Sequence, residues 1–402
     1  MQIINPTVSF SKKEMPKLVI YLLIFLFALH AAPATYINST FLEQFVHSDF
    51  VGYIFSAASI IALICFILIR RVLQIKGNYK TFLFFLTLDL LSLIILSFSL
   101  LFSSGIWPYL FIGAYVMGFI ARNICFLNFD IFLEHLTKNE ETGGVRGISL
   151  TAINMALIIG PFIAGILITD IVEAGKVYIL SLFLLIPVFI MTIRFLSNFK
   201  DTYYKKISLW NTFLEIYSNK DLRMTFSVNF VLRFFYSWMV IYFPIFLTKT
   251  IGFSISEVTL IISIALVSFI ILQIPIGLVS DKYIGEKEIM TIGLIILGSA
   301  TASMAFFVGT DSLFFWATIL FIGRIGASLV EVTNETHIFK RVDDDSINII
   351  SFYRAMRPIV YIISPIFASI LLIFFELNYL FLVLGIICFI GIFFSLSIKD
   401  TK

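Results

Sequence analysis

Twelve long apolar segments divide this chain, and they restrict its fold more than any other feature of the sequence. Hydrophobic residues make up 60% of the chain and charged residues only 13%, with a mean hydropathy of +1.02. An apolar run of about 20 residues matches the length of a membrane-spanning helix. The sequence therefore predicts an all-α polytopic membrane protein, with spans near residues 17–42, 49–69, 81–103, 106–134, 147–169, 177–196, 222–247, 256–279, 288–308, 313–336, 346–375 and 379–397.

The positive charge between these segments lies almost wholly on one side. Of the 28 Lys and Arg residues, 21 fall in segments on the side of the amino terminus, and only Lys176 and Lys249 fall on the other. Cytoplasmic loops are enriched in Lys and Arg, so this bias predicts both termini in the cytoplasm and insertion in the cytoplasmic membrane. The residues before the first segment lack the features of a removable signal peptide, so we expect that segment to be retained.

The second half of the chain repeats the pattern of the first. Gly118 corresponds to Gly323 at an offset of 205, and Gly160-Pro161 corresponds to Ser364-Pro365 at an offset of 204. The repeat predicts two pseudo-symmetric six-helix bundles, over residues 1–197 and 222–402. Bundles duplicated in this way are typical of carriers that work by alternating access.

The predicted connection between the bundles, residues 198–221, is polar and basic. It contains apolar residues at helical spacing, namely Ile207, Trp210, Leu214 and Tyr217. Two interpretations fit this pattern equally well. One is a short amphipathic helix on the inner leaflet, and the other is a solvated tether.

A short motif follows the eighth predicted span. Gly277 permits close helix approach, Asp281 supplies a carboxylate, Gly285 permits a turn, and Lys282 and Lys287 add positive charge. This arrangement resembles the loop Gly-x-x-x-Asp-Arg/Lys-x-(x)-Gly-x-Lys/Arg of the major facilitator superfamily, in its carboxy-terminal copy. With twelve spans and a two-bundle repeat, the resemblance covers nearly the whole chain and implies the fold and transport function of that family.

The amino-terminal copy of this loop, residues 69–80, is degenerate. It keeps Gly77 and the cations Arg70, Arg71, Lys76 and Lys80 but lacks the carboxylate. The resemblance implies that this loop latches the outward-facing state, so the missing carboxylate weakens that analogy. The four cations are explained more simply as charges that set the topology.

A second motif lies on the fifth predicted span. Gly160, Pro161 and Gly165 resemble the Gly-x-x-x-Gly-Pro-x-x-Gly-Gly motif of proton-linked antiporters, with alanine in place of two glycines. The alternative interpretation, which the sequence favours slightly, is a close-packing face between bundles, with a bend permitted at Pro161.

Nine charged residues fall inside predicted spans, where each unpaired charge costs at least about 2.5–3.5 kcal/mol. We expect them to face one another or a water-filled cavity. They are Asp89, Arg122, Asp130, Arg233, Arg324, Glu331, Glu335, Arg354 and Arg357. The resemblance implies that spans 1, 4, 7 and 10 line the cavity.

Helical spacing places several of these charges on common faces. The tenth span carries one polar stripe through Arg324, Glu331 and Glu335, and the seventh carries Asn229, Arg233 and Tyr236. The stripes mark a candidate site for the solute and for coupling. A cavity carboxylate such as Glu331 could take up and release a proton.

Similar depth predicts partners for the remaining charges. Asp89 is expected to form a buried structural pair with Arg122, and Glu331 and Glu335 are expected to share a network with Arg354. Arg357 is a further candidate for the cavity or for coupling. On the first span, His30 could couple protons or could be a hydrogen-bonded packing residue, which is the interpretation that the sequence favours. Tyr36 is a candidate cavity residue.

Other functional classes find no support in the sequence. Cys65, Cys125 and Cys388 have unrelated spacings, which suggests neither disulfides nor a metal site, and there is no nucleotide-binding loop. We expect no cofactor, no metal and no nucleic-acid partner.

The sequence predicts a monomeric secondary transporter of a small organic solute, coupled to protons and favouring efflux by antiport. The cavity charges favour an anionic, zwitterionic or neutral polar solute. Uptake of an anionic or polar solute by symport is the first alternative, and a transport-fold sensor or polytopic membrane enzyme is the second.

Overall fold

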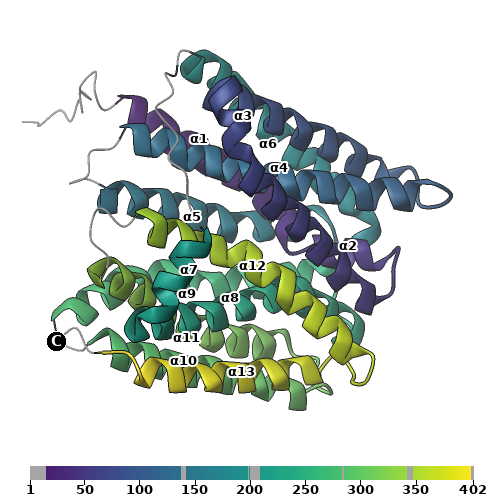
Figure 1. The fold of residues 1–402 in the computed structure, drawn as a ribbon. Helices are drawn as coiled ribbons and strands as arrows, with labels where there is room; N and C mark the ends of the chain where they lie inside the picture. The colour runs from purple at the N-terminus through teal and green to yellow at the C-terminus, as the bar shows by residue number, and fades with distance from the viewer. Residues whose placement is uncertain are drawn as a thin grey trace, which may run out of the picture.

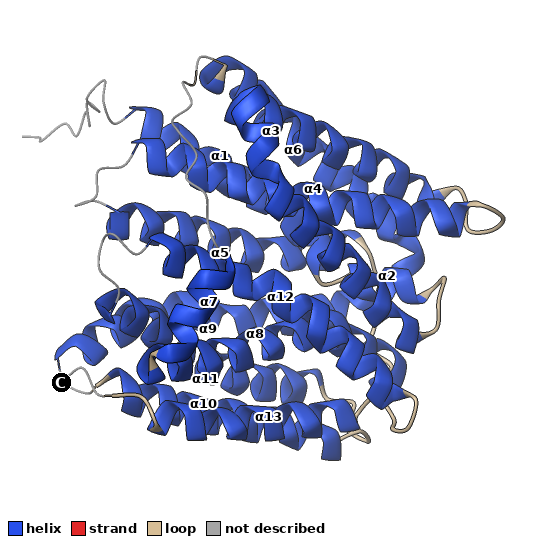
Figure 2. Cartoon of the chain, in the orientation of Figure 1, coloured by secondary structure: helices blue, strands red, loops and turns tan. Residues whose placement is uncertain are grey.

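The computed structural model describes residues 15–136, 142–197, 199, 209–282, 285–341 and 347–399. This part of the chain is helical with short connections and contains no strand (Figure 2). The elements of the first half are α1 (Met15–Thr35), α2 (Asn38–Glu43), α3 (Ser48–Ser97), η1 (Phe98–Leu100), α4 (Trp107–Leu136), α5 (Thr142–Leu167), η3 (Ile171–Glu173) and α6 (Ala174–Leu196).

The second half begins with a short helix, α7 (Leu209–Ser218), at the place where the sequence left open a helix or a tether. Its Trp210, Leu214 and Tyr217 are exposed, as lipid-facing residues would be, whereas Ile207 lies outside the described residues. The remaining elements are α8 (Lys220–Phe246), η4 (Leu247–Ile251), α9 (Ile255–Lys282), α10 (Glu286–Ser303), η5 (Met304–Phe306), α11 (Leu313–Arg341), α12 (Ile347–Leu372) and α13 (Tyr379–Leu396).

Helix α3 contributes two membrane spans. Its 50 residues would extend about 75 Å at 1.5 Å per residue, more than twice the thickness of a bilayer core. Gly77, at φ 78° and ψ 166°, breaks the helix in a conformation that favours glycine, and the two arms double back on each other (Figure 1). The eleven apolar helices of the described chain therefore supply twelve crossings.

The sequence analysis placed a degenerate loop over residues 69–80, and the structure corrects this expectation. These residues continue the two arms of α3 as helix and leave it only at Gly77. The helical propensity of the run before the glycine is enough to extend the arm past the apolar segment.

Each bundle has an aromatic core. In the N-terminal bundle, Phe27 packs against Phe82 and Phe129 with ring centroids 6.4 and 5.3 Å apart. In the C-terminal bundle, Phe246 packs against Trp316 at 5.4 Å and against Phe381 at 4.8 Å. Many large apolar side chains on the outer surfaces are exposed, as a lipid solvent permits.

The two bundles meet at one end of the molecule. The left side of Figure 1 carries the start of α1 and the end of α13, and we call it the termini end. Among the described residues, the hydrogen bonds between bundles lie in the opposite half. They are Ser39 Oγ to Val240 O, Ser56 Oγ to Ile362 O, Ser256 Oγ to Gly165 O, Ser369 Oγ to Asp49 O, and Ile255 N to Thr169 O.

A close approach at Gly52 holds this opposite end together. A Cβ atom at Gly52 would lie 2.2 Å from the Tyr242 Oη and 2.7 Å from the Pro365 carbonyl oxygen, both in the other bundle. The described bundles are therefore joined by tight contacts at the end remote from the termini.

Candidate functional site

A polar network connects α8 and α11 inside the C-terminal bundle. Arg233 Nη1 donates to Glu331 Oε1 at 3.3 Å, and Tyr236 Oη donates to Glu331 Oε2 at 3.1 Å. Arg233 Nε also donates to Asn229 Oδ1 at 3.2 Å. The side chains of Arg233 and Glu331 are 22% and 21% exposed. The carboxylate is therefore partnered but still within reach of water or a solute.

The spacing that the sequence indicated brings these residues together. Asn229, Arg233 and Tyr236 recur at steps of four and three along α8, so they share one face of that helix. Arg324 and Glu331 are seven residues apart on α11, two helical turns along one face. Because α8 and α11 pack together, the two faces meet.

Arg324 differs from the other charges of this network. It is only 2% exposed, and its guanidinium carbon lies 5.4 Å from the Phe235 ring centroid and 5.6 Å from that of Tyr236. Its Nε atom has no hydrogen-bond partner among the described residues, and the same is true of Ser328 Oγ and Asn229 Nδ2. Buried donors are normally satisfied, so this cluster has the character of a site that a polar ligand completes.

A second polar layer lies beside the network. Tyr353 Oη donates to Asn334 Oδ1 at 3.1 Å, and Asn334 Nδ2 donates to the Thr225 carbonyl oxygen at 2.9 Å. Glu335 is partly buried in the same region of α11. These contacts fix the termini-end half of α11 against α8 and α12.

The sequence indicated three other candidates. Arg357 is exposed on α12, with its guanidinium carbon 5.9 Å from the Tyr361 ring centroid. Tyr36 is buried, and it packs with apolar residues of the C-terminal bundle although it belongs to the N-terminal one. The Arg354 side chain lies outside the described residues, so its pairing with Glu331 and Glu335 stays a prediction. The partner that the structure gives Glu331 is Arg233.

The N-terminal bundle holds a separate ionic cluster. Arg122 Nη1 donates to Asp89 Oδ1 at 2.7 Å, and His30 Nε2 lies 2.8 Å from Asp89 Oδ2. The side chains of His30 and Asp89 are completely buried, and that of Arg122 is 16% exposed. Three helices, α1, α3 and α4, are thus joined at one carboxylate.

The sequence indicated the Asp89–Arg122 pair but not the contact with His30. The sequence did contain a signal for the contact between His30 and Asp89. His30 lies fifteen residues from the start of α1, and Asp89 lies twelve residues after Gly77, where the second arm of α3 begins. These counts correspond to similar depths from the termini end, about 23 and 18 Å at 1.5 Å per residue.

Comparison with known proteins identifies the family. The sequence model of the Major Facilitator Superfamily matches residues 225–402. A crystal structure of the nucleoside transporter NupG, in a mutant form, is similar in fold with a TM-score of 0.72 and 12% identity, and the alignment covers 96% of this chain and 100% of that one. The carboxy-terminal half of the chain therefore belongs to the major facilitator superfamily by its sequence, and the fold similarity extends over the whole chain. The protein is a transporter with the twelve-helix fold and not an enzyme. No curated protein matches it in sequence.

The loop motif of this superfamily member lies at the junction of α9 and α10. Gly277, Asp281 and Lys282 belong to the end of α9, but their side chains are outside the described residues. Gly285 is the N-cap of α10 with extended backbone, and Lys287 follows in its first turn.

A carboxylate that the sequence analysis missed lies in this junction. Glu286 is 1% exposed, and its Oε1 accepts from Lys340 Nζ of α11 at 2.5 Å. The adjacent Gly285 and Lys287 had drawn attention to the loop, but the pairing joins residues 54 positions apart and has no local sequence signal. In this transporter, the Glu286–Lys340 pair thus holds α10 to α11 at the termini end.

The glycines of the antiporter-like motif on α5 pack against two different neighbours. A Cβ at Gly160 would lie 2.3 Å from the Ala32 Cβ of α1, in the same bundle and beside Pro33. A Cβ at Gly165 would lie 2.2 Å from Thr259 Oγ1 of α9, in the other bundle. Pro161 lies between them, inside α5. The motif therefore packs α5 on both sides, and one of the two contacts crosses between bundles.

Proposed function

We propose that this protein is a proton-coupled secondary transporter whose solute carries an anionic or strongly hydrogen-accepting group that binds Arg324. The observation that carries the proposal is the state of Arg324. It is almost fully buried between aromatic rings, and its Nε donor is unsatisfied within the described structure. A buried cation of this kind is costly without a counter-charge, and an acceptor group of the solute would supply it.

Glu331 is the proposed coupling group. Its carboxylate accepts from both Arg233 and Tyr236 and remains partly exposed. A proton on Glu331 would remove the charge that holds Arg233. The state of this carboxylate would then decide whether Arg233 is available to a solute.

The charge of the solute determines whether solute and proton move in opposite directions or in the same direction. A zwitterion could place its acidic group at Arg324 and its amine at Glu331, where the amine would compete with a proton. Competition of this kind produces antiport, and the Gly160–Gly165 motif, which resembles that of proton-linked antiporters, favours export by this route. We infer that export by antiport from the cytoplasm is the leading function.

Uptake by symport is the second candidate, and a specific observation favours it. The network of Arg233, Arg324 and Glu331 carries one more positive than negative charge. An anionic solute would neutralise the excess, and protonation of Glu331 would free Arg233 to bind it as well, so proton and anion would bind together. The similarity in fold to a nucleoside transporter leaves polar organic solutes as the class to test first.

In both cases the two bundles would rock about the cavity between them. The tight contacts around Gly52 and Gly165 would close one end, while the network on α8 and α11 would communicate with the termini end. The charge bias of the loops supports assignment of that end to the cytoplasm.

Solute flux in proteoliposomes under an imposed pH gradient tests the proposal. Solutes would first be selected by thermal-shift screening of the purified protein against zwitterionic, anionic and neutral polar panels. Antiport predicts movement of solute against the direction of proton flow, and symport predicts movement with it. Flux that is insensitive to the gradient in the wild type, and unchanged in Glu331→Gln, would remove proton coupling from the proposal.

A further inference from the structure

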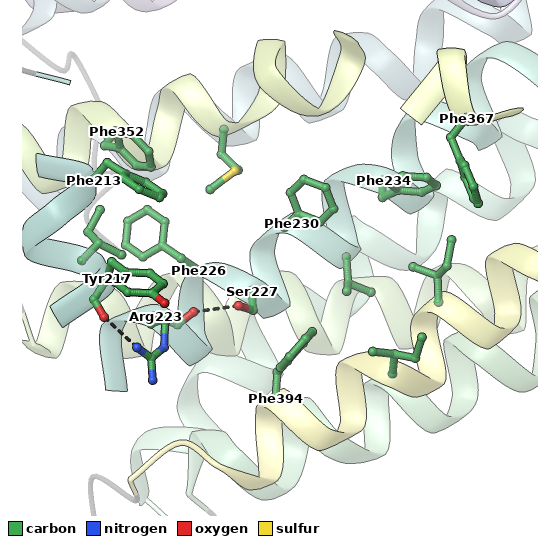
Figure 3. A pocket seen from close by; sticks show the side chains of 15 residues that line it. Phe213, Tyr217, Arg223, Phe226, Ser227, Phe230, Phe234, Phe352, Phe367 and Phe394 are labelled. Carbon is green, nitrogen blue, oxygen red and sulfur yellow. Dashed lines mark hydrogen bonds between the residues drawn. The ribbon is translucent and has the colours of Figure 1, made fainter. Parts of the chain in front are cut away.

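An open apolar groove lies on the outside of the C-terminal bundle, away from the polar network. It has a volume of about 460 Å³ and is bounded by α7, α8, α12 and α13 (Figure 3). Helices α12 and α13 each pack on α8 but make little contact with each other, so α8 forms the floor between them. Phe226, Phe230 and Phe234 line this floor, and Met356 and Phe394 lie on the two walls. The volume falls in the range typical of small-molecule sites, about 300–1,000 Å³.

The groove uses a different face of α8 from the polar network. Phe226, Phe230 and Phe234 follow one another at steps of four residues along one face. Arg233 and Tyr236 lie on average about a quarter of a turn away at 3.6 residues per turn, and neither lines the groove. The groove is therefore separate from the proposed solute site, and a ligand in it would not occupy the cavity.

One end of the groove carries a cation. Arg223 lies at the start of α8 beside α7, and its Nη1 donates to the Tyr217 carbonyl oxygen at 2.8 Å (Figure 3). Its guanidinium carbon is 5.1 Å from the Tyr217 ring centroid. Ser227, one turn further along, donates to the Arg223 carbonyl oxygen at 2.9 Å and lines the groove too. Because a guanidinium has five N–H donors, several remain for a bound phosphate.

The length of the groove matches one leaflet of a bilayer. Arg223 and Phe234 are eleven residues apart on α8, or about 16 Å at 1.5 Å per residue. Half of the hydrocarbon core of a bilayer measures about 15 Å. With Arg223 at the membrane surface, the far end of the groove reaches the midplane, as an acyl chain does.

Helix α7 indicates that Arg223 does lie at the surface. Trp210, Phe213 and Tyr217 are exposed on this ten-residue helix, and aromatic residues of this kind are enriched at the boundary between lipid and water. Phe213 and Tyr217 also close the termini end of the groove. The cation, the aromatic anchors and the mouth of the groove therefore lie at one depth.

We propose that this groove binds one acyl chain of an anionic phospholipid from the leaflet at the termini end, with the lipid phosphate at Arg223. An acyl chain fits the apolar lining and the one-leaflet length, and a negative headgroup fits the cation at the mouth. The acyl chain would fill the space between α12 and α13. Because α12 also packs against α3 of the N-terminal bundle, the bound lipid would stabilise the position of a helix that joins the two bundles.

Native mass spectrometry of the full chain tests headgroup selection. The purified protein is titrated with phosphatidylglycerol and with phosphatidylcholine of identical acyl chains. We expect one phosphatidylglycerol to be retained at least about tenfold more tightly, or about 1.4 kcal/mol, and Arg223→Gln to remove most of that preference because the charge-assisted contact with the lipid is lost. Arg223→Lys keeps the charge and should restore part of the preference.

Arg194→Gln is the matched control. Arg194 lies in the last turn of the spanning helix α6, as Arg223 lies in the first turn of α8, and its guanidinium carbon is likewise close to a ring, 5.7 Å from the Phe195 centroid. This variant should keep the preference for phosphatidylglycerol. Equal retention of both lipids by the wild type, or an equal loss in Arg194→Gln and Arg223→Gln, would overturn the proposal.

A second measurement tests insertion of the chain. Phe230→Trp places a fluorescent reporter on the floor of the groove. Phosphatidylglycerol with brominated chains should quench the added fluorescence saturably, and inorganic phosphate should not reverse it. Equal quenching by phosphatidylcholine with brominated chains would indicate ordinary contact with bulk lipid. Displacement of the lipid by inorganic phosphate would indicate an anion site alone, and either result would refute the acyl-chain site.

Discussion

The two bundles each hold a carboxylate paired with an arginine inside the membrane, but the two clusters differ in exposure and in geometry. In the N-terminal bundle, Asp89 is completely buried and its contacts with Arg122 and His30 are 2.7 and 2.8 Å long. In the C-terminal bundle, Glu331 is 21% exposed and its contact with Arg233 is 3.3 Å long. The first geometry suits a permanent connection, and the second suits a group that changes partner.

The polar atoms without hydrogen-bond partners support the same distinction between the two clusters. Around Glu331, three polar atoms lack partners within the described structure: Arg324 Nε, Ser328 Oγ and Asn229 Nδ2. The N-terminal cluster has one such atom, His30 Nδ1, at the far side of a ring that packs 4.5 Å from Phe27. We therefore propose a structural role for the N-terminal cluster and a transport role for the C-terminal one.

Removal of the buried carboxylate should have the largest effect. Asp89→Asn keeps the shape of the side chain but leaves Arg122, which is only 16% exposed, without its counter-charge. Breaking a buried pair in this way costs about 3–5 kcal/mol. We expect a loss of this size in the free energy of unfolding, measured by denaturant titration of the purified protein. A variant that is fully stable but uncoupled from the pH gradient would reverse the assignment of the two clusters.

Neutralisation of Glu331 should have a smaller effect on free energy but a more specific one. Glu331→Gln keeps hydrogen bonding to Arg233 and Tyr236, so stability should change by less than about 1 kcal/mol, as at other partly exposed pairs. Accumulation of solute driven by a pH gradient should fall about a hundredfold, whereas exchange of solute without a gradient should survive. Glu288→Gln, in the first turn of α10, is a suitable control and should behave as wild type. Unchanged accumulation in Glu331→Gln would exclude this carboxylate as the coupling group.

Arg324 is expected to contribute to binding of the solute rather than to coupling. Arg324→Gln removes the charge but keeps a hydrogen-bond donor, and the apparent affinity should fall about tenfold to a hundredfold, or about 1.4–2.8 kcal/mol. Thermal shift with a solute selected by screening measures this change. Arg357→Gln, at an exposed position on α12, should shift the affinity less than threefold. Equal losses in the two variants would mean that burial of Arg324 does not mark the anionic subsite.

Much of this arrangement could be predicted from the sequence, because hydrophobic length and helical spacing are local properties. The twelve spans follow from apolar runs, and the stripe through Arg324 and Glu331 follows from steps of 3.6 residues along one helix. Two features could not be predicted. The pairing of Glu331 with Arg233 depends on how α8 and α11 face each other, and depth alone had suggested Arg354. The continuation of α3 up to Gly77 reflects helix propensity beyond the apolar core of the span.

The smallest effect is expected at His30, and it provides the finest test of the comparison. His30→Gln keeps a donor that can reach Asp89, and Arg122 still neutralises the carboxylate, so the free energy of unfolding should fall by only about 1 kcal/mol, the typical net value of one hydrogen bond. Accumulation of solute under a pH gradient should stay within about twofold of wild type. If His30 carried the coupled proton, glutamine could not replace it, since an amide does not titrate. Loss of gradient-driven accumulation with normal stability would therefore move the coupling site into the N-terminal bundle.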